Sequence, residues 1–95
     1  MTAVTARVPT ANGAKYLQQL CKHWSHKLDV ELSEDKGIVR FADGVATMRA
    51  DPEALVVTIE AGEADAVEHL KGVVARHLDR FAFREAPLTF SWTAA

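Results

Sequence analysis

Cysteine is almost absent from this chain, since Cys21 is the only one among 95 residues and cannot form an internal disulfide. No apolar run approaches the roughly 20 residues that a bilayer-spanning helix needs. The first ten residues also lack the charged start and long apolar core of a signal peptide. These absences predict a cytoplasmic protein with no membrane partner.

An excess of charge is missing as well, because 11 lysines and arginines face 13 acidic residues for a formal net charge of -2. Nucleic-acid-binding domains are usually strongly basic, so we expect no nucleic-acid partner. The chain contains no P-loop, no G-x-G-x-x-G and no G-x-S-x-G motif. The sequence therefore offers no catalytic residue and predicts no cofactor.

What is present is the composition of an ordinary globular protein, with 48% hydrophobic and 25% charged residues. A chain of 95 residues is too short for two independent cores, so we expect a single domain over residues 1–95. Such a small domain buries only about two thirds of its unfolded surface. Its stability is therefore expected to be modest, or to be increased by a homodimer.

The most ordered pattern lies between Asn12 and Lys27, where apolar residues recur at steps of three and four. This spacing is typical of a helix with one buried face, and the stripe consists of Tyr16, Leu17, Leu20, Cys21, Trp24 and Leu28. Asn12 is suited to cap the helix, because its side-chain oxygen can accept a free backbone N–H. Cys21 lies in the stripe, so we expect a buried, unreactive thiol rather than a nucleophile.

Alternating apolar and polar residues predict strands at 2–8, 28–32, 38–42, 45–50 and 54–61. Residues 33–37 predict a turn in which Gly37 can adopt a positive φ. Asp43-Gly44 is typical of a two-residue hairpin, and residues 51–53 predict a further turn. The four later strands should thus form an antiparallel meander. One face of the whole sheet is expected to be mixed polar, with Arg7, Glu31, Arg40, Thr58 and Glu60 among its residues.

A second amphipathic helix is predicted from Glu63 to about Phe81, with Gly72 as a point of close packing. The alternation of Leu88, Phe90 and Trp92 with polar residues predicts a last strand. The fold class is therefore α+β, in the order β-α-β-β-β-β-α-β, with an antiparallel sheet and two helices packed on one face. The residues expected to be largely buried include Leu20, Trp24, Val57, Ile59, Leu70, Val74 and Leu78.

Cationic and imidazole side chains gather toward the ends of both helices, and the candidate ligand- or partner-binding residues are Lys22, His23, His26, Lys27, Arg76 and Arg80. Paired arginines can grip a carboxylate or phosphate. Cations at a helix end are also explained by the helix dipole alone, and the arginines by ion pairs to Asp79 and Glu85.

Metal binding is not expected from the histidine spacing. His23 and His26 stand three apart and face similar directions, but two imidazoles fall short of the three or four ligands of a typical zinc site. His69 and His77 lie eight residues apart, or about 12 Å along a helix, which is too far for one ion.

The segments KHWSHK and RHLDRFAFRE, together with the meander between them, resemble the small bacterial proteins called domain of unknown function 2218. The resemblance covers essentially the whole chain and implies a fold but no established activity or catalytic residue. Relatives of that family joined to siderophore-interacting flavoproteins imply an accessory role in ferric-siderophore handling, with such a flavoprotein as partner.

The sequence thus favours a non-catalytic binding or accessory module that docks an anionic small ligand or a flavoprotein at its basic helix ends. One alternative is a small enzyme that uses a histidine as general base and an arginine for charge stabilisation. Another alternative is a structural homodimer that uses the polar face of the sheet.

Overall fold

The computed structural model describes residues 2–95. Helices and strands follow one another in the predicted order, and their bounds are β1 (Thr2–Pro9), α1 (Gly13–Trp24), β2 (Asp29–Leu32), β3 (Lys36–Phe41), β4 (Gly44–Ala50), β5 (Ala54–Ala61), α2 (Ala64–Phe81) and β6 (Thr93–Ala94). Within these residues neither helix is both long and apolar enough to cross a membrane.

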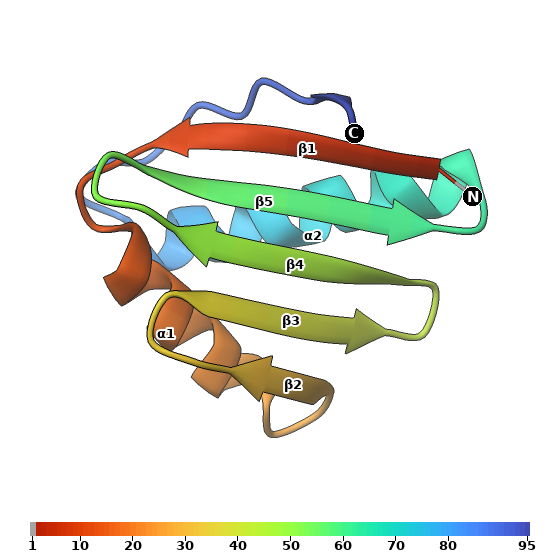
Figure 1. Cartoon of the computed structure of the whole chain (residues 1–95), viewed down its shortest axis with the longest axis horizontal. Coiled ribbons are helices and arrows are strands. Elements are labelled where there is room, and N and C mark those ends of the chain that lie inside the picture. The colour runs from red at the N-terminus through yellow and green to blue at the C-terminus, as the bar shows by residue number, and fades with distance from the viewer. Residues whose placement is uncertain (1) are drawn as a thin grey trace.

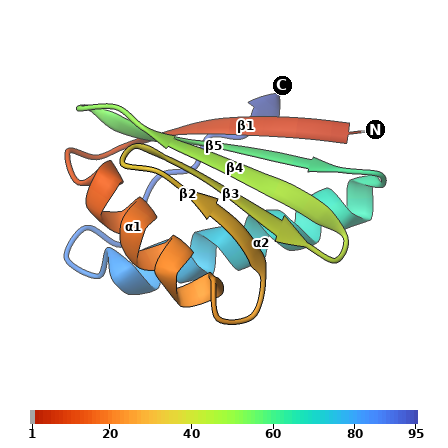
Figure 2. The same cartoon turned by 60° about the horizontal axis from the view of Figure 1, so that its bottom comes forward.

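The strands form one antiparallel sheet in the order β2-β3-β4-β5-β1-β6 (Figure 1). The first strand, β1, pairs with β5, which is the last strand of the meander. Both helices cover the same face of this sheet, and the other face is open (Figure 2). The predicted α+β class, element order and one-sided helix packing are confirmed.

The core lies between the helices and the covered face of the sheet. Alternate residues of the central strands point into it, because side chains on a strand change face at every step. All seven residues that the sequence predicted as buried are buried, and so are further sheet residues: Ala6, Val8, Val39, Ala46, Met48 and Leu55. The five residues predicted for the polar face alternate with the buried residues along their strands, so they lie on the opposite face of the sheet.

Gly37 corrects the predicted turn, since it lies inside β3 and no glycine of residues 2–95 has a positive φ. A Cβ at this position would lie 2.5 Å from the Sγ atom of Cys21 and 2.9 Å from Cδ1 of Leu17. The glycine is needed because α1 packs directly on β3 there. The two-residue loop of the next hairpin likewise consists of Ala42 and Asp43, and Gly44 pairs with Phe41 in the sheet.

Two other local predictions also differ from the structure. The Asn12 side chain makes no cap hydrogen bond to α1. Gly72 is not a point of contact between elements, because a Cβ there would meet only the guanidinium of Arg76, from the next turn of the same helix.

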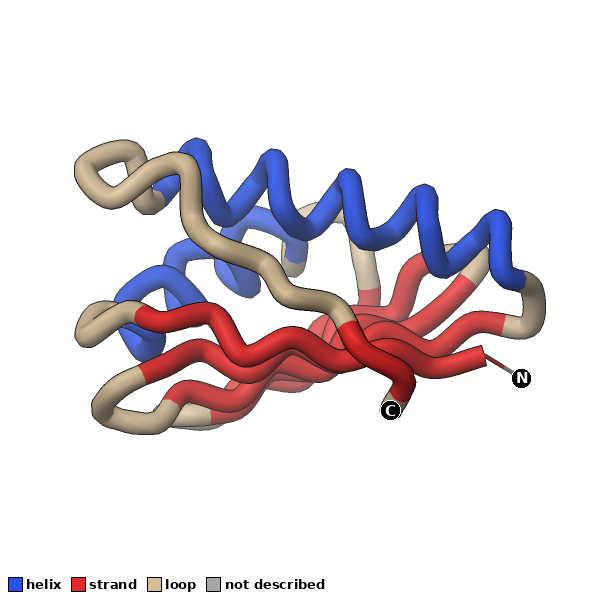
Figure 3. Tube along the Cα trace, turned by 90° about the horizontal axis from the view of Figure 1, so that it is seen from above, coloured by secondary structure: helices blue, strands red, loops and turns tan. Residues whose placement is uncertain are grey.

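The predicted last strand is wrong for residues 88–92, which are irregular and cross the edge of the core between α2 and β1 (Figure 3). Only Thr93–Ala94 pairs with β1, as strand β6. Leu88, Phe90 and Trp92 are nevertheless half-buried while their neighbours are exposed. An extended chain alternates its side chains whether or not it has a partner strand, so the pattern was right about burial and wrong about pairing.

Replacing Gly37 with alanine should lower the free energy of unfolding by about 1–3 kcal/mol, the usual cost of overpacking a core. Denaturant melts measure this cost, and Gly62→Ala is the matched control because a Cβ there meets nothing within 4 Å. Adding Cys21→Ala should reduce the effect of Gly37→Ala, since it removes the nearest atom. Equal melts for the Gly37 and Gly62 variants would contradict the packing of α1 on β3.

The thiol of Cys21 should react slowly in the folded protein. Its side chain is fully buried, and burial raises its pKa to about 11, so both access and thiolate formation are suppressed. Labelling by a thiol reagent should be slow in buffer and fast in denaturant. In a Ser25→Cys variant, which adds an exposed thiol, one fast and one slow group are expected, and two fast groups would refute the prediction.

Candidate functional site

A carboxylate with three side-chain donors ties the exit of α2 to the entry of α1. The Thr10 hydroxyl donates to the two carboxylate oxygens of Glu85 at 2.9 and 3.1 Å, and the Asn12 amide donates at 3.1 Å. The hydroxyl of Tyr16 donates to the same carboxylate. We call these four residues the Glu85 clasp.

The hydrogen bonds of the Glu85 clasp shift the pKa values of both Glu85 and Tyr16. The donors, Tyr16 first and then Asn12 and Thr10, stabilise the charged carboxylate and lower the pKa of Glu85. The hydrogen bond to Glu85 raises the pKa of Tyr16, and burial adds to this shift. At neutral pH the tyrosine is thus held as a donor and the glutamate as an acceptor.

A surface hollow of about 180 Å³ lies next to the Glu85 clasp, between α1 and the segment that follows α2. We call it the clasp hollow, and its lining combines two cations, three aromatic rings and one amide: Lys15, Arg84, Tyr16, Phe81, Phe83 and Gln19. Phe83 is 72% exposed, which is unusual for so large an apolar side chain. The exposed ring and the two cations present apolar and charged surface side by side at this hollow.

The charge around the clasp hollow is positive. Lys15 and Arg84 contribute two positive charges and Glu85 one negative charge, which leaves a net charge of one. The three donors of the Glu85 clasp also partly offset the negative charge of its carboxylate. The guanidinium of Arg84 lies 5.8 Å from the centre of the Phe83 ring, so a cation and an aromatic face are presented together.

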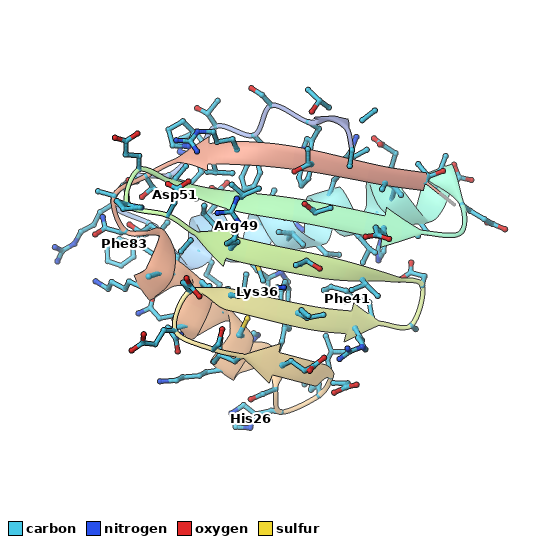
Figure 4. The ribbon with its side chains drawn as sticks, viewed as in Figure 1. His26, Lys36, Phe41, Arg49, Asp51 and Phe83 are labelled. Atoms are coloured by element: carbon cyan, nitrogen blue, oxygen red, sulfur yellow. The ribbon has the colours of Figure 1, made fainter. Side chains whose placement is uncertain are left out.

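The six sequence-predicted residues are distributed along both helices. Helix α1 ends at Trp24, so His26 and Lys27 lie in the following turn, and Figure 4 shows His26 at the lower edge of the molecule and Phe83 at its left edge. His23 and His26 therefore do not share a helical face as expected. Lys22 is exposed at the end of α1, and Arg76 and Arg80 are exposed on α2.

The structure brings His23 to the second helix rather than to His26. Its ring centre lies 5.8 Å from that of His77 and 5.8 Å from that of Phe81. The ion pairs expected for the arginines are also replaced by other contacts within residues 2–95. Asp79 accepts the backbone N–H of Leu88 at 2.9 Å, and Glu85 belongs to its clasp.

No group of three potential metal ligands from histidine, cysteine, aspartate or glutamate occurs in the described part of the chain. The histidines are also outside the lining of the clasp hollow. A general base is thus not provided there by imidazole. What the clasp hollow offers is a positively charged, partly aromatic surface.

The model of a protein family described as an uncharacterized protein conserved in bacteria, domain of unknown function 2218, matches residues 5–93. The chain belongs to this family. The match spans all elements from within β1 to the start of β6, so the resemblance seen in the sequence is confirmed.

The NMR structure of PA4090 from Pseudomonas aeruginosa has the same fold, with a TM-score of 0.84 and 34% sequence identity. The similarity covers 98% of this chain and 96% of that one. No curated protein matches the sequence. Family and fold are therefore established, and function has to be argued from the site.

The clasp hollow was only partly visible in the sequence of this family member. Residues 76–85 are the densest mixture of cations and aromatic residues in the sequence, and they include Phe81, Phe83 and Arg84. Lys15 and Gln19 looked like ordinary residues of a wet helix face. Their role depends on where the segment after α2 returns, which spacing along the chain does not specify.

Replacing Glu85 with glutamine should lower the stability at pH 7 and weaken its dependence on acid. A folded-state pKa below the unfolded value, about 4.3 for glutamate, adds stability that is present above that value and is lost as the pH falls through the folded pKa. Denaturant melts from pH 7 to pH 3 measure this loss in the wild type.

Glu34→Gln is a matched control for this experiment, because Glu34 is exposed and its side chain does not belong to the Glu85 clasp. It should leave the acid dependence close to that of the wild type. If Glu85→Gln and Glu34→Gln changed the curve equally, the Glu85 clasp would not contribute to stability.

Proposed function

We propose that this protein is a non-catalytic binding module that takes a small organic anion with one aromatic ring in the clasp hollow. The observation that carries the proposal is the placement of Lys15 and Arg84 beside the rings of Phe81 and Phe83 around one hollow. The cations match a carboxylate or phenolate, and the rings match a planar apolar body.

The size of the clasp hollow decides how much of a ligand it can hold. Its volume of about 180 Å³ is below the roughly 300–1,000 Å³ of sites that enclose drug-sized molecules. It therefore accommodates a single ring, either as a whole small molecule or as one arm of a larger one. The remainder of a larger ligand would lie on the surface beside Phe83.

The chemistry of the lining supports binding rather than turnover. Tyr16 contributes a phenolic hydroxyl to this hollow, and that hydroxyl donates its hydrogen bond to Glu85. The raised pKa of Tyr16 makes it a poorer proton donor to a substrate. A bound anion would thus meet charge and apolar surface but no group positioned to take or give a proton.

A siderophore-related role is an extension of this proposal. Ferric siderophores built from catechol or salicylate rings are anions with planar aromatic arms, which is the chemistry that the clasp hollow fits. A siderophore-interacting flavoprotein is the protein partner that the family resemblance implies. Both are tested as ligands below, beside the single-ring probes.

Titration of the 15N-labelled protein with salicylate, followed by NMR, tests the proposal. A dissociation constant of about 1 mM is expected for so small a ligand, with shifts centred on Lys15, Gln19 and Arg84. Salicylamide, which lacks the carboxylate charge, and cyclohexanecarboxylate, which lacks the planar aromatic ring, should both bind more weakly. Equal binding of all three compounds would contradict the proposed recognition of ring and charge.

Alanine variants distinguish binding in the clasp hollow from binding at the cationic residues that the sequence predicted. Arg84→Ala should weaken salicylate binding about tenfold, the effect of losing one charge-assisted contact of about 1.4 kcal/mol, and Lys15→Ala should weaken it less. Arg80→Ala and His26→Ala are controls at the sequence-predicted positions. A loss confined to these controls would move the site to that surface.

A ferric catecholate siderophore and a siderophore-interacting flavoprotein form the second arm of the experiment. Binding of either one that is weakened by Arg84→Ala would support the extension. Absence of binding for both would remove the siderophore role and leave the single-ring proposal to be judged on salicylate alone.

A further inference from the structure

An imidazole lies directly beside the clasp hollow. The ring centre of His23, in the last turn of α1, is 5.8 Å from that of Phe81, which lines the hollow. Gln19, another lining residue, is one turn before His23 on the same helix. We propose that His23 is an anion subsite that extends the clasp hollow. The preferred ligand is then an aromatic dianion that has an acidic group at each end of one ring. The subsite depends on the proposed function, because it narrows the class of anion that the clasp hollow takes.

The ring of His23 is available as a hydrogen-bond donor. It is exposed to solvent, so a ligand can reach its nitrogens. An imidazole carries at least one N–H, and it can therefore donate to a carboxylate in its neutral and in its charged form. The neighbouring His77 is not equivalent, because its Nδ1–H donates to the carbonyl oxygen of Val73 at 2.7 Å and Nε2 of the neutral ring only accepts. His23 is thus the donor of this imidazole pair.

Contacts from α2 restrict the position of the His23 ring. Phe81 meets the ring edge-on, with an angle of 64° between the two planes, and the ring centre of His77 lies 5.8 Å away. His77 is in turn packed against the buried ring of Trp24, at 5.1 Å between ring centres. The two helices pack against each other on the covered face of the sheet (Figure 2). His23 is therefore held close to the hollow, which lowers the entropy that is lost when a ligand binds.

The spacing along α1 sets the length of the ligand. Lys15, Gln19 and His23 follow one another at steps of four residues, so they share one side of the helix. Lys15 and His23 are about 12 Å apart along the helix axis, at 1.5 Å per residue. Their side chains reach toward the ligand from both ends, so a ring with a short acidic arm is long enough. One acidic group then meets Lys15 and Arg84, the ring lies beside Phe81, and the second acidic group meets His23.

The charges around His23 suit a second acidic group. Residues 13–27 include three lysines and no aspartate or glutamate. Residues 73–84, from the later half of α2 and its exit, include three arginines and one acidic residue, Asp79. The carboxylate of Asp79 accepts the backbone N–H of Leu88 at 2.9 Å. A carboxylate placed at His23 is thus attracted by its surroundings, whereas a neutral group in the same place is not.

Two probes that differ only in the second acidic group test the subsite, in NMR titrations of the labelled protein at low salt. The first is para-carboxyphenylpropanoate, and the second carries an amide in place of the propanoate carboxylate. The dianion should bind about fivefold more tightly than the amide, the upper range for contacts between solvent-exposed charged groups. This preference should disappear in His23→Ala. It should persist in His26→Ala, which removes an exposed imidazole beyond the end of α1.

Arg84→Ala separates the subsite from the proposed function. It should weaken both probes by the same factor and leave the preference for the dianion unchanged, because Arg84 acts at the other end of the ligand. The backbone N–H signals of each variant report whether the fold is retained, and replacing the exposed His23 removes little packing. Equal binding of the two probes, or a preference that survives in His23→Ala or is lost equally in His26→Ala, would overturn the subsite alone. Absence of binding for both probes would refute the proposed function and the subsite together.

Discussion

The carboxylate of Glu85 is the constraint on which the shape of the functional surface depends. Its three donors come from the loop before α1 and from the first turns of that helix. The bond therefore joins the two helices at one end, although Thr10 and Glu85 are 75 residues apart in sequence. Phe83 lies two residues before this anchor, so it is held at the surface instead of retreating into the core.

The packing of α1 on the sheet fixes the position of this helix relative to α2. Gly37 lets the helix approach β3 so closely that Cys21 and Leu17 lie against the strand backbone. The side of α1 that faces α2 then carries Lys15 and Gln19 near its start and His23 near its end. The clasp hollow and the contact between His23 and His77 are consequently two parts of one seam between the helices, and Phe81 belongs to both.

Local patterns were sufficient for β1 to β5, both helices and the buried faces, because period and burial are linked within each element. They failed where a distant segment decided the outcome. Gly37 was assigned to a turn by local preference, whereas its actual reason is the side chain of Cys21 above it. Glu85 was paired with nearby arginines by spacing, whereas its partners are 69 to 75 residues away. His23 was matched with His26 on its own helix, and only the fold could place it beside His77.

The open face of the sheet bears on the homodimer alternative. Lys36 and Arg49 are directly opposite each other on β3 and β4, where like charges destabilise a sheet, and both point to the uncovered side (Figure 4). Arg40 on the same face is bound to Asp29 and Glu31, which leaves Glu60 as the acidic residue of that face without an ion pair in residues 2–95. The three cations Lys36, Arg40 and Arg49 are balanced by the three carboxylates Asp29, Glu31 and Glu60, so the net charge of this face neither favours nor opposes a symmetric dimer. The helix seam therefore remains the surface on which the proposal rests because of what it contains, two cations and aromatic rings around one hollow, and the sheet face offers no comparable excess of charge.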